Sequence, residues 1–240
     1  MTKFFHKLTL SLAALVVCST VLAFDMPEIN LPDGFQIKVL TDQVPGARSM
    51  ALGDKGTLFV STMGEGKVYA ISGTDSQPEV LTIASDLYMP NGIAFKDGNL
   101  YVAEIHRVHK FEDIEDRLNA PKSKVINKSY PTDRHHGWRY ITFGPDGKLY
   151  IPIGSPCNIC DEPDYGVITR IDTDGSNKEV IAHGIRNTVG ITFHPQTIDL
   201  WFTDNNKDMM GDDIPPGELN RLGTEGEHFG FPFCHANDIP

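Results

Sequence analysis

Short apolar stretches alternate with polar turns along the chain, and the same order recurs four times. Each copy consists of an apolar stretch, a turn rich in Gly, Asp or Pro, and a second apolar stretch. The copies span residues 50–60, 92–102, 140–151 and 190–202. β-Branched and aromatic residues favour a pleated sheet, and Asp-Gly or Pro-Asp-Gly closes a tight turn. Each copy therefore predicts a β-hairpin.

The spacing of these hairpins indicates a propeller. They recur roughly every 40–50 residues, which is the length of one blade of about four strands. Further apolar stretches at residues 67–71, 107–111 and 167–171 fit the later strands of their blades. The alternative is an open β-sandwich with coincidental turns, which four copies in the same order disfavour. The pattern predicts an all-β propeller with about four blades, plus one short helix at residues 112–118, where two apolar residues four positions apart share a face.

The N-terminal segment has the pattern of an export signal. A positively charged start precedes an apolar run at residues 8–17, which is too short to cross a bilayer, and small residues follow up to Ala23. This predicts a signal peptide over residues 1–23 and a mature propeller domain over residues 24–240. Lipidation at Cys18 is disfavoured because a bulky valine precedes it. We expect an exported, periplasmic protein without a membrane span.

The charge balance narrows the classes of partner. The chain has 32 acidic and 21 basic residues, a net charge of −11. Binding to nucleic acid phosphates needs a basic surface, so this composition argues against a nucleic-acid partner. An acidic balance is compatible with cation binding.

Three cysteines follow the predicted signal peptide: Cys157, Cys160 and Cys234. In an oxidising compartment the Cys157/Cys160 pair favours a small disulfide over a redox centre. A haem attachment site would need a histidine after the pair, and Asp161 stands there. A zinc site would need further ligands at ordered spacing. Cys234 has no obvious partner.

Polar segments between the predicted strands are candidates for chemistry, because a propeller places its ligand loops there. They span residues 133–139, 183–187 and 203–213. Each could be a solvated or structural loop, and the acidic third segment could instead suit a hard cation such as calcium, although it lacks EF-hand spacing. His136 and Arg186 occupy corresponding loops of successive repeats, so we expect them to converge on one end of the central channel.

Several of these motifs together resemble the glucose/sorbosone dehydrogenase family, particularly its sorbosone-dehydrogenase-like branch. The matching segments are residues 136–150, 154–157, 184–187, 204–205, 211–220 and 228–232. The resemblance implies a six-bladed propeller that binds pyrroloquinoline quinone (PQQ) and calcium and oxidises sugars. Because about four blades are predicted, we expect a C-terminally truncated fragment of such a protein, which could itself be inactive.

The resemblance also implies roles for individual residues. His136 would be the general base that takes the proton of the substrate hydroxyl while hydride passes to PQQ. Arg186 would face the quinone oxygens and stabilise negative charge, and Asn187 would help to hold the cofactor. One departure is His135, which stands where the glucose-oxidising branch has an aspartate.

Calcium would be held by the segment Asp204, Asn205 and Asn206, partly through backbone oxygens. The substrate would be a small sugar, an aldose or sugar aldehyde, and the electron acceptor is not identified by the sequence. Two other functions stay open: a non-catalytic exported propeller that binds a carbohydrate or protein partner, and a calcium-dependent lactonase-like propeller hydrolase.

Overall fold

The computed structural model describes residues 29–74, 77–237 and 239. The predicted signal peptide, residues 1–23, lies outside these described residues and stays a prediction. Among the described residues, no helix has the length and apolar character needed to cross a membrane.

The chain divides into two compact units, Met1–Lys38 and Val39–Pro240. The described part of the first unit contains neither strand nor helix. Its one ordered turn is closed by the Phe35 amide, which donates to the Pro32 carbonyl at 3.1 Å.

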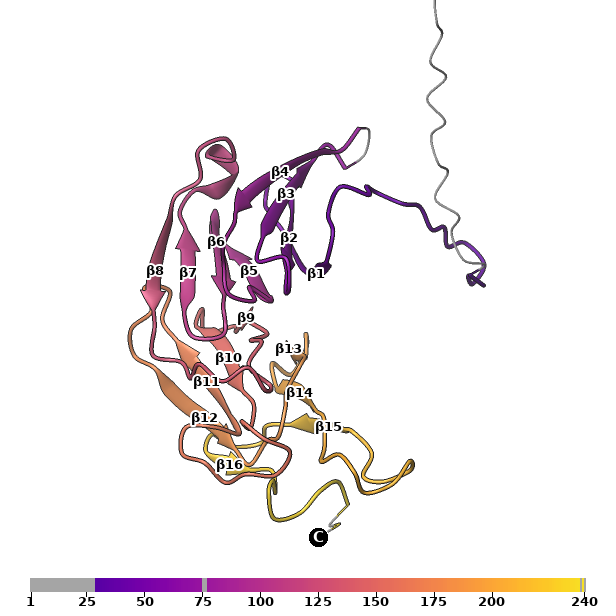
Figure 1. Cartoon of the computed structure of the whole chain (residues 1–240), viewed down its shortest axis with the longest axis vertical. Helices are drawn as coiled ribbons and strands as arrows, with labels where there is room; N and C mark the ends of the chain where they lie inside the picture. Colours follow the sequence, from indigo (N-terminus) through magenta and orange to yellow (C-terminus); the bar gives the residue numbers. More distant parts are fainter. Residues whose placement is uncertain (1–28, 75–76, 238, 240) are drawn as a thin grey trace, which may run out of the picture. The chain divides into compact units, whose positions relative to one another are not determined.

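The second unit contains four β-sheets that follow one another along the chain (Figure 1). In the first two sheets each strand pairs antiparallel with the next. The elements of these two sheets are β1 (Ala47–Leu52), β2 (Leu58–Thr62), β3 (Val68–Ser72), β4 (Glu79–Ala84), β5 (Gly92–Lys96), β6 (Asn99–Ala103), β7 (Val108–Phe111) and β8 (Ser123–Asn127).

The last two sheets depart from this regular order. The third has four antiparallel strands and a fifth, β16, which pairs parallel to β12 at the sheet edge. The fourth has three strands among the described residues. The elements are β9 (Thr142–Phe143), β10 (Leu149–Ile153), β11 (Val167–Ile171), β12 (Glu179–His183), β13 (Ile191–Phe193), β14 (Leu200–Asp204), β15 (Glu218–Arg221) and β16 (Glu227–His228).

Glycines with positive φ close the first three predicted hairpins. Gly56, Gly98 and Gly147 have φ values of 84°, 75° and 79°, a region that side chains disfavour. In the third hairpin the Gly144 amide donates to the Lys148 carbonyl at 2.9 Å, which closes the turn. All four predicted hairpins are present, as β1–β2, β5–β6, β9–β10 and β13–β14.

The core lies between successive sheets. One apolar cluster joins the first and second sheets, another the second and third, and another the third and fourth. Strands such as β6 and β10 are therefore covered on both faces, and they contain consecutive buried residues instead of alternating buried and exposed ones. Sheets stacked face to face in chain order are blades, so the predicted all-β propeller with four blades is confirmed, and the sandwich alternative is wrong.

One predicted element is shorter than expected. Residues 112–118 do not form a regular helix but only a short 3₁₀ turn, η1 (Ile114–Asp116). The turn is bounded by Asp113, at φ 47°, and by Arg117, at φ −130°, which both leave helical geometry. The predicted apolar face does reach the core, because Ile114 is buried and Leu118 packs on the same cluster.

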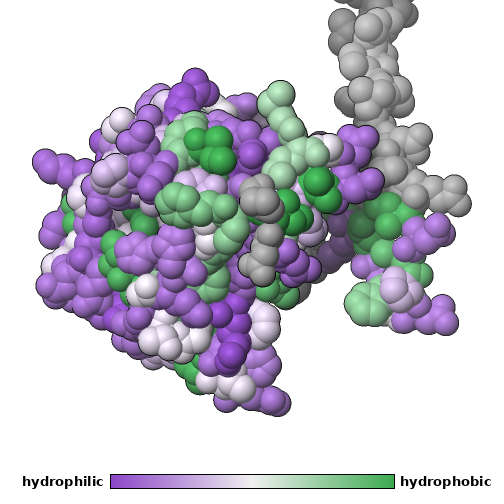
Figure 2. Space-filling model, turned by 90° about the horizontal axis from the view of Figure 1, so that it is seen from below, coloured by the Kyte–Doolittle hydropathy of each residue, from purple (hydrophilic) through white to green (hydrophobic). Residues whose placement is uncertain are grey.

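The outer surface differs from these interfaces. Figure 2 shows a face that is mainly hydrophilic, with apolar groups in separate small areas. The apolar residues that stabilise the fold thus gather between the blades, where their burial removes them from water.

Candidate active site

Four segments surround a cavity of about 650 Å³ that is lined mainly by polar and charged residues, which we call the polar cavity. The segments before β5, before β9 and after β12 each lead from one blade to the next, and the segment after β14 leads to β15 of the same blade. The residues that line this cavity are Met89, Arg134, His135, His136, Trp138, Arg186, Asn187, Asn205 and Asp208. The structure therefore brings together four of the six predicted site residues and leaves Asp204 and Asn206 outside the lining.

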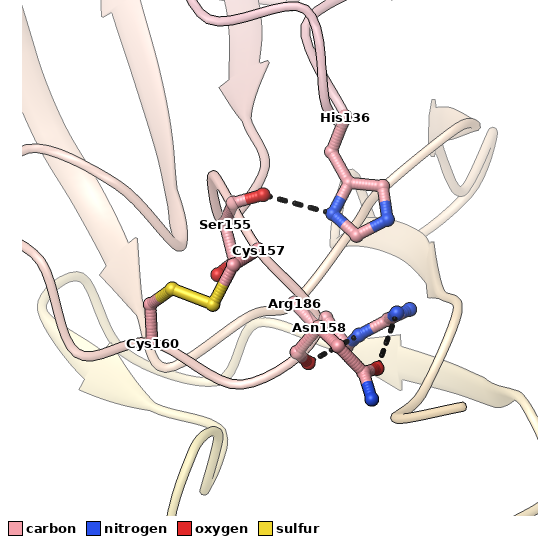
Figure 3. Close-up of a disulfide and its surroundings, with 6 residues drawn as sticks. All are labelled: His136, Ser155, Cys157, Asn158, Cys160 and Arg186. Atoms are coloured by element: carbon pink, nitrogen blue, oxygen red, sulfur yellow. Dashed lines mark hydrogen bonds between the residues drawn. A yellow bond between two sulfur atoms is a disulfide. The ribbon is translucent and has the colours of Figure 1, made fainter. Parts of the chain in front are cut away.

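His136 is oriented by the main chain of the third blade. Its Nδ1 lies 2.9 Å from the Ser155 carbonyl oxygen (Figure 3). A carbonyl only accepts hydrogen bonds, so Nδ1 carries the proton and Nε2 has a free lone pair. The residue has φ 49°, and Gly154 lies so close that an added Cβ would be 2.6 Å from the His136 Cβ. The site thus depends on a glycine at position 154.

The His136 imidazole is kept neutral. Burial, then the positive charge of Arg186, and then His135 lower the pKa of His136 to about 4. At neutral pH the ring is therefore an unprotonated base, which is the form that can accept a proton.

Arg186 is 2% exposed and held by hydrogen bonds on several sides. Its Nε donates to the Asn158 carbonyl and its Nη1 to the Asn205 carbonyl, both at 2.9 Å. Its Nη2 donates to Asn158 Oδ1 at 2.9 Å and to Asp208 Oδ2 at 2.6 Å. A guanidinium has five N–H donors, so one donor on Nη1 has no partner among the described residues and can serve a ligand.

Asp204 holds the turn that carries Arg186 and Asn187. Its carboxylate accepts the Arg186 amide at 2.9 Å and the Asn187 amide at 2.7 Å. Burial raises the pKa of Asp204 to about 6, and the two backbone donors oppose this shift. Its side chain thus orients the two neighbouring site residues, a task that the sequence did not reveal.

Asn206 bonds within its own loop and to the start of β15. Its Nδ2 donates to the Pro216 carbonyl at 2.7 Å and to Glu218 Oε1 at 2.9 Å. Within the part of the chain that the structure describes, no three His, Cys, Asp or Glu side chains are grouped so as to hold a metal ion. Calcium binding by residues 204–206 stays a prediction, and it depends on amide and backbone oxygens.

The predicted disulfide joins Cys157 and Cys160, with their Cα atoms 5.8 Å apart. Both sulfurs are thereby unavailable as zinc ligands or free thiols. Cys234 carries no disulfide within the described residues. The bridge closes a small loop around Asn158, and Figure 3 shows this loop beside both His136 and Arg186.

Two contributors to the site were missed from the sequence. Asn158 binds the Arg186 guanidinium, and the signal that could have indicated it is its position inside the Cys157/Cys160 pair. Arg139 is 2% exposed and donates to the carbonyls of Ile105, His136 and Pro131, so it secures the loop that bears the base.

A second cavity, of about 360 Å³, lies beside β11 and β12 and is lined in part by His183 and His228. It contains none of the predicted site residues. Of these two cavities in the described part of the chain, the polar cavity is the one whose lining combines a histidine with an arginine guanidinium.

Fold and site together define a β-propeller with a polar cavity formed by the loops that connect its strands and blades. Residues 29–238 match the family described as TrAA12-like, and the chain belongs to this family. It is also 30% identical over 225 residues to a Borreliella burgdorferi protein described as uncharacterized. This match covers 88% of this chain and 58% of the Borreliella protein.

Solved structures share the fold at low sequence identity. The calcium structure of a Trichoderma reesei enzyme of carbohydrate-active family AA12 has a TM-score of 0.73 at 20% identity, covering 87% of this chain and 62% of that one. The holo PQQ domain of a Coprinopsis cinerea pyranose dehydrogenase has a TM-score of 0.73 at 17% identity, covering 86% and 58%. A PQQ-bound aldose sugar dehydrogenase from Streptomyces coelicolor has a TM-score of 0.66 at 16% identity, covering 85% and 68%. The chain thus spans about 60% of the length of the first two of these proteins.

Proposed function

We propose that this chain carries the catalytic base of a PQQ-dependent sugar dehydrogenase that oxidises an aldose or sugar aldehyde, as in the glucose/sorbosone type. The observation that supports the proposal most directly is the His136 geometry. Its Nδ1 proton is donated to the Ser155 carbonyl, which leaves Nε2 unprotonated, and the Arg186 guanidinium lines the same cavity. A hydroxyl-oxidising enzyme needs such a base to take the substrate proton.

The residues present fit the cofactor. PQQ is a flat anion with several carboxylates, and the cavity of about 650 Å³ presents two guanidinium groups, Arg134 and Arg186. The buried Trp138 Nε1, from a residue that lines the cavity, has no hydrogen-bond partner among the described residues, as if a ligand acceptor belonged there. Arg186, with its uncommitted donor, and Asn187 would hold the quinone.

Calcium would be bound beside the quinone through the Asp204–Asn206 segment. Asn205 lines the cavity and offers an amide oxygen, the kind of hard donor that calcium takes. Asp204 would act mainly through its hold on the Arg186–Asn187 turn.

When bound, the quinone supplies a two-electron acceptor for the hydride of the substrate carbon. Nε2 of His136 accepts the hydroxyl proton as the carbon–oxygen double bond forms. The Arg186 charge stabilises the negative charge that develops nearby, and it also disfavours a lasting imidazolium at His136, so the proton is passed on to solvent.

The test is reconstitution of the full-length protein with PQQ and calcium, assayed on a panel of aldoses with an electron-accepting dye. We expect His136→Ala to lower kcat by at least about 100-fold, the usual contribution of a general base. His183→Ala, an exposed histidine outside the polar cavity, should leave kcat unchanged. Turnover of lactones with calcium and no quinone would contradict the proposal, as would full activity of His136→Ala.

We also propose that the protein is exported to the periplasm after removal of residues 1–23. The Cys157–Cys160 disulfide supports this, because such bonds persist in oxidising compartments. Cell fractionation with N-terminal sequencing tests it. A cytosolic product that keeps residues 1–23 would overturn this part.

A further inference from the structure

The disulfide-closed loop contacts both functional side chains of the cavity. We name residues 155–160 the clamp loop. At one end, the Ser155 carbonyl accepts the His136 Nδ1 proton at 2.9 Å, and the Ser155 amide donates to the Arg186 carbonyl at 2.8 Å. At the other end, Asn158 accepts two hydrogen bonds from the Arg186 guanidinium. One short loop thus sets the relative position of base and guanidinium (Figure 3).

Asn158 is itself fixed from a second side. Its Oδ1 accepts the Asp208 amide at 2.8 Å, and its Nδ2 donates to the Asp208 carbonyl at 3.1 Å. Through its side chain and carbonyl, Asn158 therefore links the Arg186 guanidinium to the segment after β14. Few residue types could replace Asn158, because this pair of hydrogen bonds to the Asp208 backbone needs an acceptor and a donor on one planar group.

The loop has little other support. Residues 154–166 contain no strand, and Ile159, at the tip of the loop, is 46% exposed. A segment without regular pairing and with an exposed tip is free to move unless it is cross-linked. The Cys157–Cys160 bridge flanks Asn158 on both sides and restricts its backbone directly.

We propose that Asn158 is the positioning residue for Arg186, and that the Cys157–Cys160 bridge keeps it in place. The bridge is thus a structural part of the active site and makes ligand binding sensitive to reductants. The ligand part of this inference rests on the proposed function, whereas the positioning of Arg186 beside His136 does not.

Two measurements separate these parts. The first is the pKa of His136, measured by NMR on the protein without ligand. This pKa reports on the position of Arg186, because the Arg186 charge helps to lower it. The other charged or titratable neighbours of His136 are His135 and Asp208. The second is the Kd for PQQ, measured by quenching of tryptophan fluorescence.

We expect Asn158→Ala to raise the His136 pKa toward its ordinary value, because Arg186 is then less firmly held. We expect the same variant to weaken PQQ binding about ten-fold, the effect of losing one hydrogen bond to a charged group. Ile159→Ala is the matched control, since this exposed side chain lies in the same loop and no hydrogen bond involves it. It should change neither quantity.

A second perturbation does not depend on whether Asn158→Ala folds: the Cys157–Cys160 bridge of the wild-type protein is reduced with a dithiol. Two electrons and two protons convert the bridge to two thiols, while the dithiol closes to its own disulfide. Both quantities should then shift in the same direction as in Asn158→Ala, and a Cys157→Ser/Cys160→Ser variant should not respond to the dithiol. Unchanged His136 pKa in both the reduced protein and Asn158→Ala would overturn the inference. If the oxidised wild type did not bind PQQ but the His136 pKa still shifted in Asn158→Ala and in the reduced protein, only the proposed function would be overturned.

Discussion

Replacement of Gly154 by alanine should displace the His136 side chain and so lower the catalytic rate, although His136 itself is unchanged. An added Cβ would lie 2.6 Å from the His136 Cβ and 3.1 Å from Asn187 Oδ1. Ordinary van der Waals contact begins at 3.4 Å, so His136 would have to move by about 0.8 Å. A misplacement of about 1 Å can cost roughly 100-fold in rate, and overpacking costs about 1–3 kcal/mol in stability.

We therefore expect Gly154→Ala to lower kcat/KM about 100-fold in the dye-linked sugar assay and the free energy of unfolding by about 1–3 kcal/mol in urea. Gly64→Ala is the control, because a Cβ there would meet nothing within 4 Å and its φ is not in the positive region. If the two variants behaved alike, the close approach of the third blade to His136 would have no functional meaning, and the reasoning would be refuted.

Three further predictions concern charged or titratable groups. Because the pKa of His136 is lowered to about 4, the acid limb of the pH profile of kcat/KM should lie near pH 4, and a limb near 6.5 would contradict this. The unfolded chain binds the His136 proton first, so the contribution of His136 to stability should fall as pH drops from about 6.5 toward 4. Asp204, whose pKa is raised to about 6, acts in the opposite direction, so the difference in urea unfolding between wild type and His136→Ala at several pH values isolates this contribution. Asp204→Ala should lower the free energy of unfolding by about 3 kcal/mol, because two buried amides lose their acceptor. Wild-type stability in that variant would mean that water or another group replaces the carboxylate.

The hairpins and the convergence of two loops were predictable because they depend on residues that are close in sequence. Turns that contain Asp and Gly, placed between apolar stretches, specify β1–β2 and β5–β6 locally. Their regular repetition places His136 and Arg186 in equivalent loops, and the structure does put both in one cavity. The helix predicted at residues 112–118 is reduced to the 3₁₀ turn η1, because a single apolar pair at four-residue spacing does not specify a longer helix.

The supporting contacts could not be predicted in this way. Asn158 lies 28 residues from Arg186 and 50 from Asp208; its position inside the cysteine pair marks the residue, but no local pattern identifies these partners. The acidic run after β14 suggested a cation, whereas in the structure the Asp204 carboxylate binds two backbone amides. An acidic side chain in a sequence does not show which positive group or donor it will meet.

The sequence by itself determined the all-β class, the four repeated hairpins and the two loops that meet at the cavity. All of these follow from local turn chemistry and from a constant repeat length. Only the tertiary structure decided the tautomer of His136, the orientation of Arg186 by the clamp loop, and the parallel pairing of β16 with β12. These features depend on hydrogen bonds between segments distant in the chain, whose partners are chosen by the packing of whole blades.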